Sequence, residues 1–204
     1  MQFLDFRQQL TDYIVFSIND VKKIYPDFNW MNLVAWQKKD YIQKLRNGWY
    51  RFSDRKTDES VLFYIANKIY SPSYVSFETA LSYYGLIPEA VFIISSVSTL
   101  KTEKIKNDAG SFTYTTLKPS CFFGYELVHK NTFSFKIASI EKTLLDYFYI
   151  HKSVKTFEDI AALRLNKAIL TEQIKIPKLD DYSRLFDSKS LDKRIILLKK
   201  YLYA

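Results

Sequence analysis

The stretch YIQKLRNGWYRF, residues 41–52, predicts a β-hairpin. Ile42 and Leu45 flank two polar residues, as expected for a half-buried strand. Arg46-Asn47-Gly48 is the expected turn, because Asn-Gly is among the strongest short hairpin signals. Trp49 to Phe52 then form the return strand. The hairpin follows a segment whose pattern is helical, and this order of elements decides the interpretation of the N-terminal quarter.

Three short helices are expected before the hairpin. Phe3, Phe6 and Leu10 recur at helical spacing and predict the first helix. Ser17 begins the second helix, with Asp20 in the reciprocal position of a capping box, and Pro26 ends it. The third helix is expected over residues 29–39, with an inward set of Trp30, Leu33, Val34 and Trp36 and an outward set of Asn32, Ala35, Lys38 and Lys39.

Three helices followed by a hairpin predict a winged helix-turn-helix over residues 1–57. In that arrangement the third helix enters the major groove, and the hairpin lies along the backbone or in the minor groove. Asn32 is expected to read a base edge, since Asn pairs well with adenine, whereas Asn29 either contacts DNA or caps the third helix. Basic side chains mainly neutralise phosphates. The expected DNA-binding residues are Asn29, Asn32, Lys38, Lys39, Arg46, Asn47 and Arg51. The alternative is a small protein–protein module.

The distribution of charge favours nucleic acid as the partner of this segment. The chain carries a net charge of +8. Residues 1–57 hold 10 Lys/Arg and 6 Asp/Glu, whereas the remaining 147 residues hold 20 and 16. Both parts therefore carry a net charge of +4, so net positive charge per residue is more than twice as dense in the first quarter, which fits a nucleic-acid-binding segment. A lysine-rich proteome is the alternative explanation.

Residues 58–204 read as a second, mixed α/β domain, after a polar boundary at residues 53–60. Residues 71–90, SPSYVSFETALSYYGLIPEA, predict a helix capped by the Ser76 side chain and closed by Gly85. Strands are expected at 91–98, 111–117, 121–128 and 132–138, with a polar connection at 99–110, and helices are expected at 61–70, 139–150, 157–165 and the C-terminal end. The expected fold class is α+β.

Several classes of protein fit poorly. No run of about 18 apolar residues exists, so we expect no membrane span. The N-terminus lacks a signal-peptide pattern, and Cys121 is the single cysteine, so a cytoplasmic protein without disulfides is expected. His129 and His151 have no metal-site spacing, and no phosphate-binding glycine loop is present. We therefore expect no enzyme activity, no cofactor and no metal; a nuclease or transferase is the disfavoured alternative.

Four segments resemble the AbiEi-type antitoxins, which regulate bacterial toxin–antitoxin and phage-defence operons. The N-terminal segment ending in LRNGWYRF is similar to the DNA-binding domain of that family. In the second domain, Ala138, Glu141, Lys142, Leu145 and Asp146 match a helix-opening pattern of the family. The resembling segments outside the first quarter are SPSYVSFETALSYYGLIPEA, FTYTTLKPSCFFGYE and IASIEKTLLDYFY.

The resemblance implies a bifunctional protein of the abortive-infection type. Its N-terminal domain would bind inverted repeats in double-stranded DNA upstream of its own operon and act as a repressor. Its C-terminal domain would counter a neighbouring nucleotidyltransferase-like toxin, and in the described systems this is thought not to need a stable complex. The alternative is a transcriptional regulator whose C-terminal domain senses a ligand or partner. The sequence leaves open whether the protein is a monomer in solution or a dimer on DNA.

Overall fold

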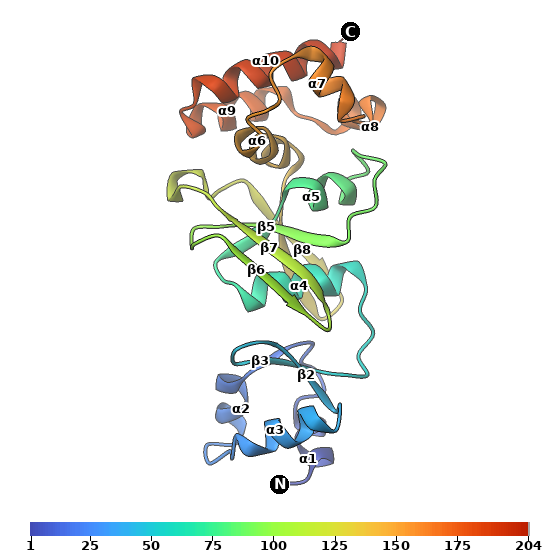
Figure 1. Ribbon diagram of the computed structural model, residues 1–204, viewed down its shortest axis with the longest axis vertical. Coiled ribbons are helices and arrows are strands. Elements are labelled where there is room, and N and C mark those ends of the chain that lie inside the picture. Colours follow the sequence, from blue (N-terminus) through green and yellow to red (C-terminus); the bar gives the residue numbers. More distant parts are fainter. Residues whose placement is uncertain (204) are drawn as a thin grey trace.

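The computed structural model describes residues 1–203 and has an α+β fold. Figure 1 shows three tiers along the long axis: a small N-terminal unit, a larger β-sheet, and a layer of helices that contains the C-terminus. In the part of the chain so described, no helix is both long and apolar enough to cross a membrane.

The N-terminal unit has the three helices and the hairpin expected from the sequence. Its small antiparallel sheet has the order β1-β3-β2. Ser17 and Asp20 form the predicted capping box at the start of α2. Aromatic rings fill the core, with Phe6, Phe16 and Phe52 fully buried. The elements are α1 (Phe3–Gln9), β1 (Phe16–Ser17), α2 (Ile18–Ile24), α3 (Met31–Lys38), β2 (Ile42–Arg46) and β3 (Trp49–Phe52).

The packing of the third helix differs from expectation at its beginning. Leu33 and Trp36 are buried as predicted, and Val34 is half-buried. Trp30 is 63% exposed, so the prediction that it packs inward is wrong. The cause is the later start of the helix: α3 begins at Met31, and Trp30 belongs to the loop that precedes it.

The second tier is a mixed six-stranded sheet with the order β6-β7-β5-β4-β9-β8. The pairs β5/β7 and β4/β9 are parallel, and the other neighbours are antiparallel. The strands are β4 (Ser73–Val75), β5 (Ile93–Ser98), β6 (Glu103–Asn107), β7 (Gly110–Thr116), β8 (Tyr125–Lys130) and β9 (Phe133–Ala138).

Three segments of this sheet differ from the sequence-based prediction. The strand β4 lies in the segment 71–90, for which only a helix was expected. The expected polar connection at 99–110 contains the edge strand β6, whose charged residues alternate with half-buried ones. Charged side chains are common on edge strands because they discourage pairing with other chains. The strand expected at 121–128 begins later, at Tyr125, because Pro119–Cys121 form a short 3-10 helix (η1) with Cys121 buried.

Helices cover both faces of the sheet. The helix α4 (Glu59–Ile69) packs on the face that carries Val75, Phe135 and Ile137. On the opposite face lie α5 (Phe77–Tyr83) and α6 (Ile140–Ile150), which pack with Tyr74 and Val97. Ser139 caps α6 as predicted, its side chain accepting from the amide of Lys142.

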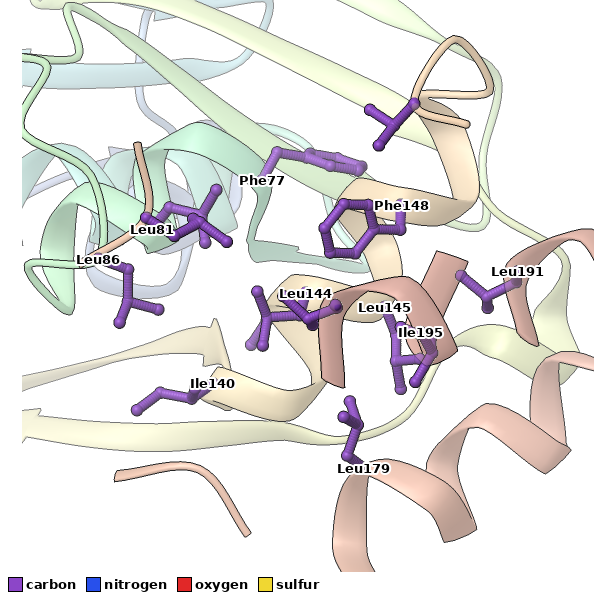
Figure 2. Packing of buried hydrophobic residues seen from close by; sticks show 14 of the residues in the cluster. Phe77, Leu81, Leu86, Ile140, Leu144, Leu145, Phe148, Leu179, Leu191 and Ile195 are labelled. Atoms are coloured by element: carbon purple, nitrogen blue, oxygen red, sulfur yellow. The ribbon is translucent and has the colours of Figure 1, made fainter. Parts of the chain in front are cut away.

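The third tier surrounds α6 with four helices. Figure 2 shows Leu144, Leu145 and Phe148 of α6 between α5 on one side and the C-terminal helices on the other. The predicted stripe of α10 is buried there, including Leu191, Ile195 and Leu198. The helices are α7 (Phe157–Ala162), α8 (Lys167–Gln173), α9 (Ile176–Phe186) and α10 (Lys189–Tyr203); the sequence pattern does not predict α8 or α9.

Candidate nucleic-acid interface

Figure 1 shows α3 on the side of the N-terminal unit that lies away from the larger sheet. Residues three and four apart share a helix face, which places Met31, Ala35 and Lys38 in one exposed stripe. Leu33 and Trp36 lie on the opposite, buried side and hold the helix against the small core. The aromatic core thus fixes which side chains of α3 face solvent.

The two asparagines predicted at this surface have different surroundings. The side-chain oxygen of Asn29 accepts a hydrogen bond of 2.9 Å from the amide of Met31. This satisfies one of the unpaired amides of the first helical turn, although the N-cap position itself is occupied by Trp30, whose side chain makes no capping hydrogen bond. Asn32 is half-buried and borders a surface depression of about 330 Å³ that Ile24, Tyr25 and Phe28 also line.

Lys38 and Lys39 are both exposed at the C-terminal end of α3. The amino group of Lys39 lies 6.0 Å from the centroid of the Tyr41 ring, at the outer limit of a cation–π contact. Lysines in a last helical turn also interact favourably with the helix dipole. Their exposure leaves both amino groups accessible to an anionic ligand.

The hairpin turn lies against the second tier through its first residue, Arg46. The Arg46 guanidinium donates a 2.9 Å hydrogen bond to the Ile69 carbonyl and lies 4.5 Å from the centroid of the Tyr70 ring. The Leu45 carbonyl accepts a 2.8 Å hydrogen bond from the Asn107 side chain. The predicted phosphate contact of Arg46 is contradicted by this placement, because its guanidinium joins the two parts of the chain. Asn47 is exposed beside it.

Arg51 is also placed inside the protein, with 3% of its surface exposed. Its guanidinium donates to the hydroxyl of Thr57, at 2.6 Å, and to the carbonyl of Arg55. Burial lowers the pKa of Arg51, while the charge of Asp54 acts in the opposite direction. The predicted phosphate contact of Arg51 is therefore wrong: the side chain holds the connection between β3 and α4 against the hairpin.

A second polar cluster lies in the core between β4 and α6. Lys142 and Asp146 form an ion pair with both side chains fully inaccessible. Asp146 also accepts hydrogen bonds from the hydroxyls of Ser76, at 2.8 Å, and Tyr74, at 3.0 Å. Ser76 thus bonds Asp146 instead of capping α5, which corrects the prediction for its side chain. Residues 142 and 146 matched the family pattern, but no local signal indicated that they pair with β4.

Burial has opposite effects on the two charged groups of this cluster. It raises the pKa of Asp146 and lowers that of Lys142, and each charge counteracts the shift of the other. The amino group of Lys142 also donates a 2.7 Å hydrogen bond to the Tyr74 hydroxyl. Since the pair is sealed from solvent, we interpret the cluster as a structural link and not as a substrate site.

Glu141 joins α6 to the start of α9 and does more than complement a helix dipole. Its carboxylate lies 2.9 Å from the Lys178 amino group and accepts a 3.0 Å hydrogen bond from the Lys175 amide. Burial opposes ionisation of Glu141, but these two donors together hold its pKa below the usual value. Glu141 therefore stabilises the contact between two helices.

Residues 1–203 contain no group of three His, Cys, Asp or Glu side chains arranged to hold a metal ion. No protein-family model matches the chain, and no curated protein matches it either. The exposed face of α3, with Asn32, Lys38 and Lys39, is the candidate site that combines open side chains with basic charge.

Proposed function

We propose that residues 1–57 form a winged helix-turn-helix that binds double-stranded DNA upstream of the protein's own operon and represses it. The observation that carries this proposal is the outward face of α3 with its exposed lysines, at the end of the molecule away from the larger sheet (Figure 1). A recognition helix must be free to enter the major groove. In this proposal the hairpin serves as a joint to the second domain, because Arg46 is engaged with Ile69 and Tyr70.

We further propose that residues 58–204 counter a nucleotidyltransferase-like toxin encoded next to this gene. The support is the resemblance of residues 71–90 and 137–149 to the AbiEi-type antitoxins. These two segments touch through the hydrogen bond between Ser76 and Asp146. The protein would then combine repression and antitoxicity in the cytoplasm, and neither activity requires it to be an enzyme.

Binding of the protein to its own upstream region tests the DNA-binding half. A gel-shift titration with that region and with a scrambled duplex of equal length should show tighter binding to the upstream region. A reporter under the same promoter should be repressed by the full chain and less so by Lys38→Ala/Lys39→Ala. Equal affinity for the two duplexes would contradict the assignment as a sequence-specific repressor.

Growth rescue tests the antitoxin half. Cells that express the neighbouring toxin should grow when the full chain is co-expressed. The variant Lys38→Ala/Lys39→Ala should rescue equally well, since both residues lie outside the proposed antitoxin domain. Failure of the full chain to rescue, with the protein soluble, would remove the antitoxin function and leave the DNA-binding half standing.

A pocket in the second domain favours a different role for that domain. The pocket measures about 250 Å³ and lies among α5, α6 and α7. Most of its lining is apolar, with Leu81, Ile87 and Tyr147, and two carboxylates, Glu78 and Glu89, also line it. This volume is just under the usual range for small-molecule sites. A regulator that senses an apolar ligand is therefore the second candidate, and a ligand that raises the melting temperature and releases DNA would support it.

A further inference from the structure

The centre of the exposed face of α3 is apolar. Met31 is 51% exposed, and Ala35 is exposed one turn later on the same face. Trp30, the residue before the helix, is also 63% exposed. Large exposed apolar side chains are costly to leave in water without a partner, and a group of them indicates a contact surface.

Basic side chains adjoin this apolar surface. Lys38 continues the stripe of Met31 and Ala35 towards the C-terminal end of α3, and Lys39 follows it. The segment that bears them, residues 1–57, has ten basic and six acidic residues. An occupant must therefore offer apolar groups together with negative charge. The major groove of DNA meets both requirements, because thymine presents a C5-methyl group between two rows of phosphates.

We propose that Met31 and Ala35 recognise thymine methyl groups in the major groove, so that the bound sequence has thymines beneath α3. This inference rests on the DNA binding proposed above and specifies which sequences are preferred. Ala35 has no hydrogen-bonding group and the thioether sulfur of Met31 is only a weak acceptor, and among the major-groove edges of the four bases thymine alone presents a methyl group. The lysines then bind DNA of any sequence, and the Met31–Ala35 stripe provides the preference for thymine.

Removal of single methyl groups from the DNA tests this inference directly. The probe is a duplex that the full chain selects from a random pool, resynthesised with deoxyuridine in place of one thymidine at a time. Deoxyuridine keeps the base pair and removes only the methyl group. At one or more positions we expect roughly fourfold weaker binding, which corresponds to the burial of about one methyl group.

Variants of α3 identify the side chain that responds to the methyl group. Met31→Gln keeps the length of an exposed side chain and should abolish the difference between thymidine and deoxyuridine at its position. Lys38→Ala is the matched control, because it should weaken both duplexes equally and leave their ratio unchanged. Far-ultraviolet circular dichroism of both variants should match that of the wild type, since Met31 and Lys38 are exposed.

The possible failures can be told apart. Tight binding to the selected duplex with no loss at any deoxyuridine position overturns the inference and leaves the proposed function intact. A change in the sedimentation of the free protein on Met31→Gln, with no effect on the thymidine ratio, assigns the stripe to contact between copies of the chain and also overturns it. Absence of binding to any duplex removes the proposed function itself.

Discussion

Asp146 is the acceptor on which the buried cluster of the second domain depends. Lys142, Tyr74 and Ser76 all donate to it, from α6, from β4 and from the residue before α5. A buried ion pair contributes little net stability compared with well-packed apolar side chains, but removal of one partner leaves an uncompensated charge. The cluster is therefore more sensitive to a single substitution than to replacement of the pair.

Asp146→Ala should destabilise the protein by about 3–5 kcal/mol, because Lys142 would keep its charge without a partner. Urea denaturation followed by far-ultraviolet circular dichroism measures the free energy of unfolding. The control is the double variant Lys142→Met/Asp146→Leu, which should recover most of the loss. If Asp146→Ala lowers the free energy of unfolding by less than about 1 kcal/mol, the pair does not act as a unit.

The sequence did not predict the contacts of two arginines, Arg46 and Arg51. The exposure of Lys38 and Lys39 followed from their positions on an amphipathic helix, and the structure has both exposed. Arg46 and Arg51 stood in a hairpin with a basic turn and were assigned to phosphates. Their partners, the carbonyls of Ile69 and Arg55, lie in other segments. Backbone acceptors leave no pattern in the side-chain sequence, so these internal contacts could not be predicted.

At the scale of elements, one side chain of α10 adds hydrogen bonds to its apolar packing against α6. The guanidinium of Arg194 donates to the carbonyls of Val154, at 2.8 Å, Phe148, at 3.3 Å, and Lys152, at 3.2 Å. Arg194 is 7% exposed, so water cannot easily replace these bonds. Three carbonyls at and beyond the end of a helix are thus satisfied by one planar group.

Arg194→Lys should destabilise the protein by about 1–3 kcal/mol, although the positive charge is kept. The three carbonyls are placed to accept from the planar guanidinium, and a single ammonium group cannot reach all of them. The free energy of unfolding from urea titration is the measurement. Lys200→Ala, an exposed position on the same helix, should leave it unchanged. Wild-type stability in the Arg194→Lys variant would refute the role given to the fork.

Most elements were predictable where local signals coincide. The structure contains the helices predicted from the caps at Ser17 and Ser139 and the hairpin predicted from the Asn-Gly turn. The edge strand β6 was missed because its exposed lysines resemble a loop. The direction of the hairpin turn was also missed, since it depends on packing of Leu45 and Trp49 against the second domain. Local sequence patterns thus predict helices and strands better than they predict which elements pack together.

Across the whole molecule, one hydrophobic cluster bridges the first two tiers, although the N-terminal unit also has an aromatic core of its own. Val15 and Leu45 of the N-terminal unit are buried in the same cluster as Phe63 and Ile65 of α4. Two polar contacts, Arg46 with Ile69 and Asn107 with Leu45, border this junction. The polar segment 53–60 is therefore a boundary in sequence, while the parts it joins are packed together.

This bridging cluster predicts coupled unfolding. The three tryptophans, at positions 30, 36 and 49, all lie in the N-terminal unit, so their fluorescence reports on that unit and, through Trp49, on its contact with the second domain. In the wild type, fluorescence and circular dichroism should give coincident urea transitions. Arg46→Ala/Asn107→Ala should shift the fluorescence transition to lower urea, whereas Lys104→Ala, exposed on β6, should not. Coincident transitions in the double variant would contradict the coupling.

We propose that the face of α3, and not the hairpin turn, neutralises DNA phosphates. The most direct measurement is the affinity for the upstream duplex at several salt concentrations, for the wild type and two variants. Each lost phosphate contact should reduce the slope of log K against log salt by about 0.9. We predict that Lys38→Ala/Lys39→Ala reduces the slope by almost two units while Arg46→Ala leaves it unchanged. An unchanged slope for the lysine variant, with a reduced slope for Arg46→Ala, would contradict the claim.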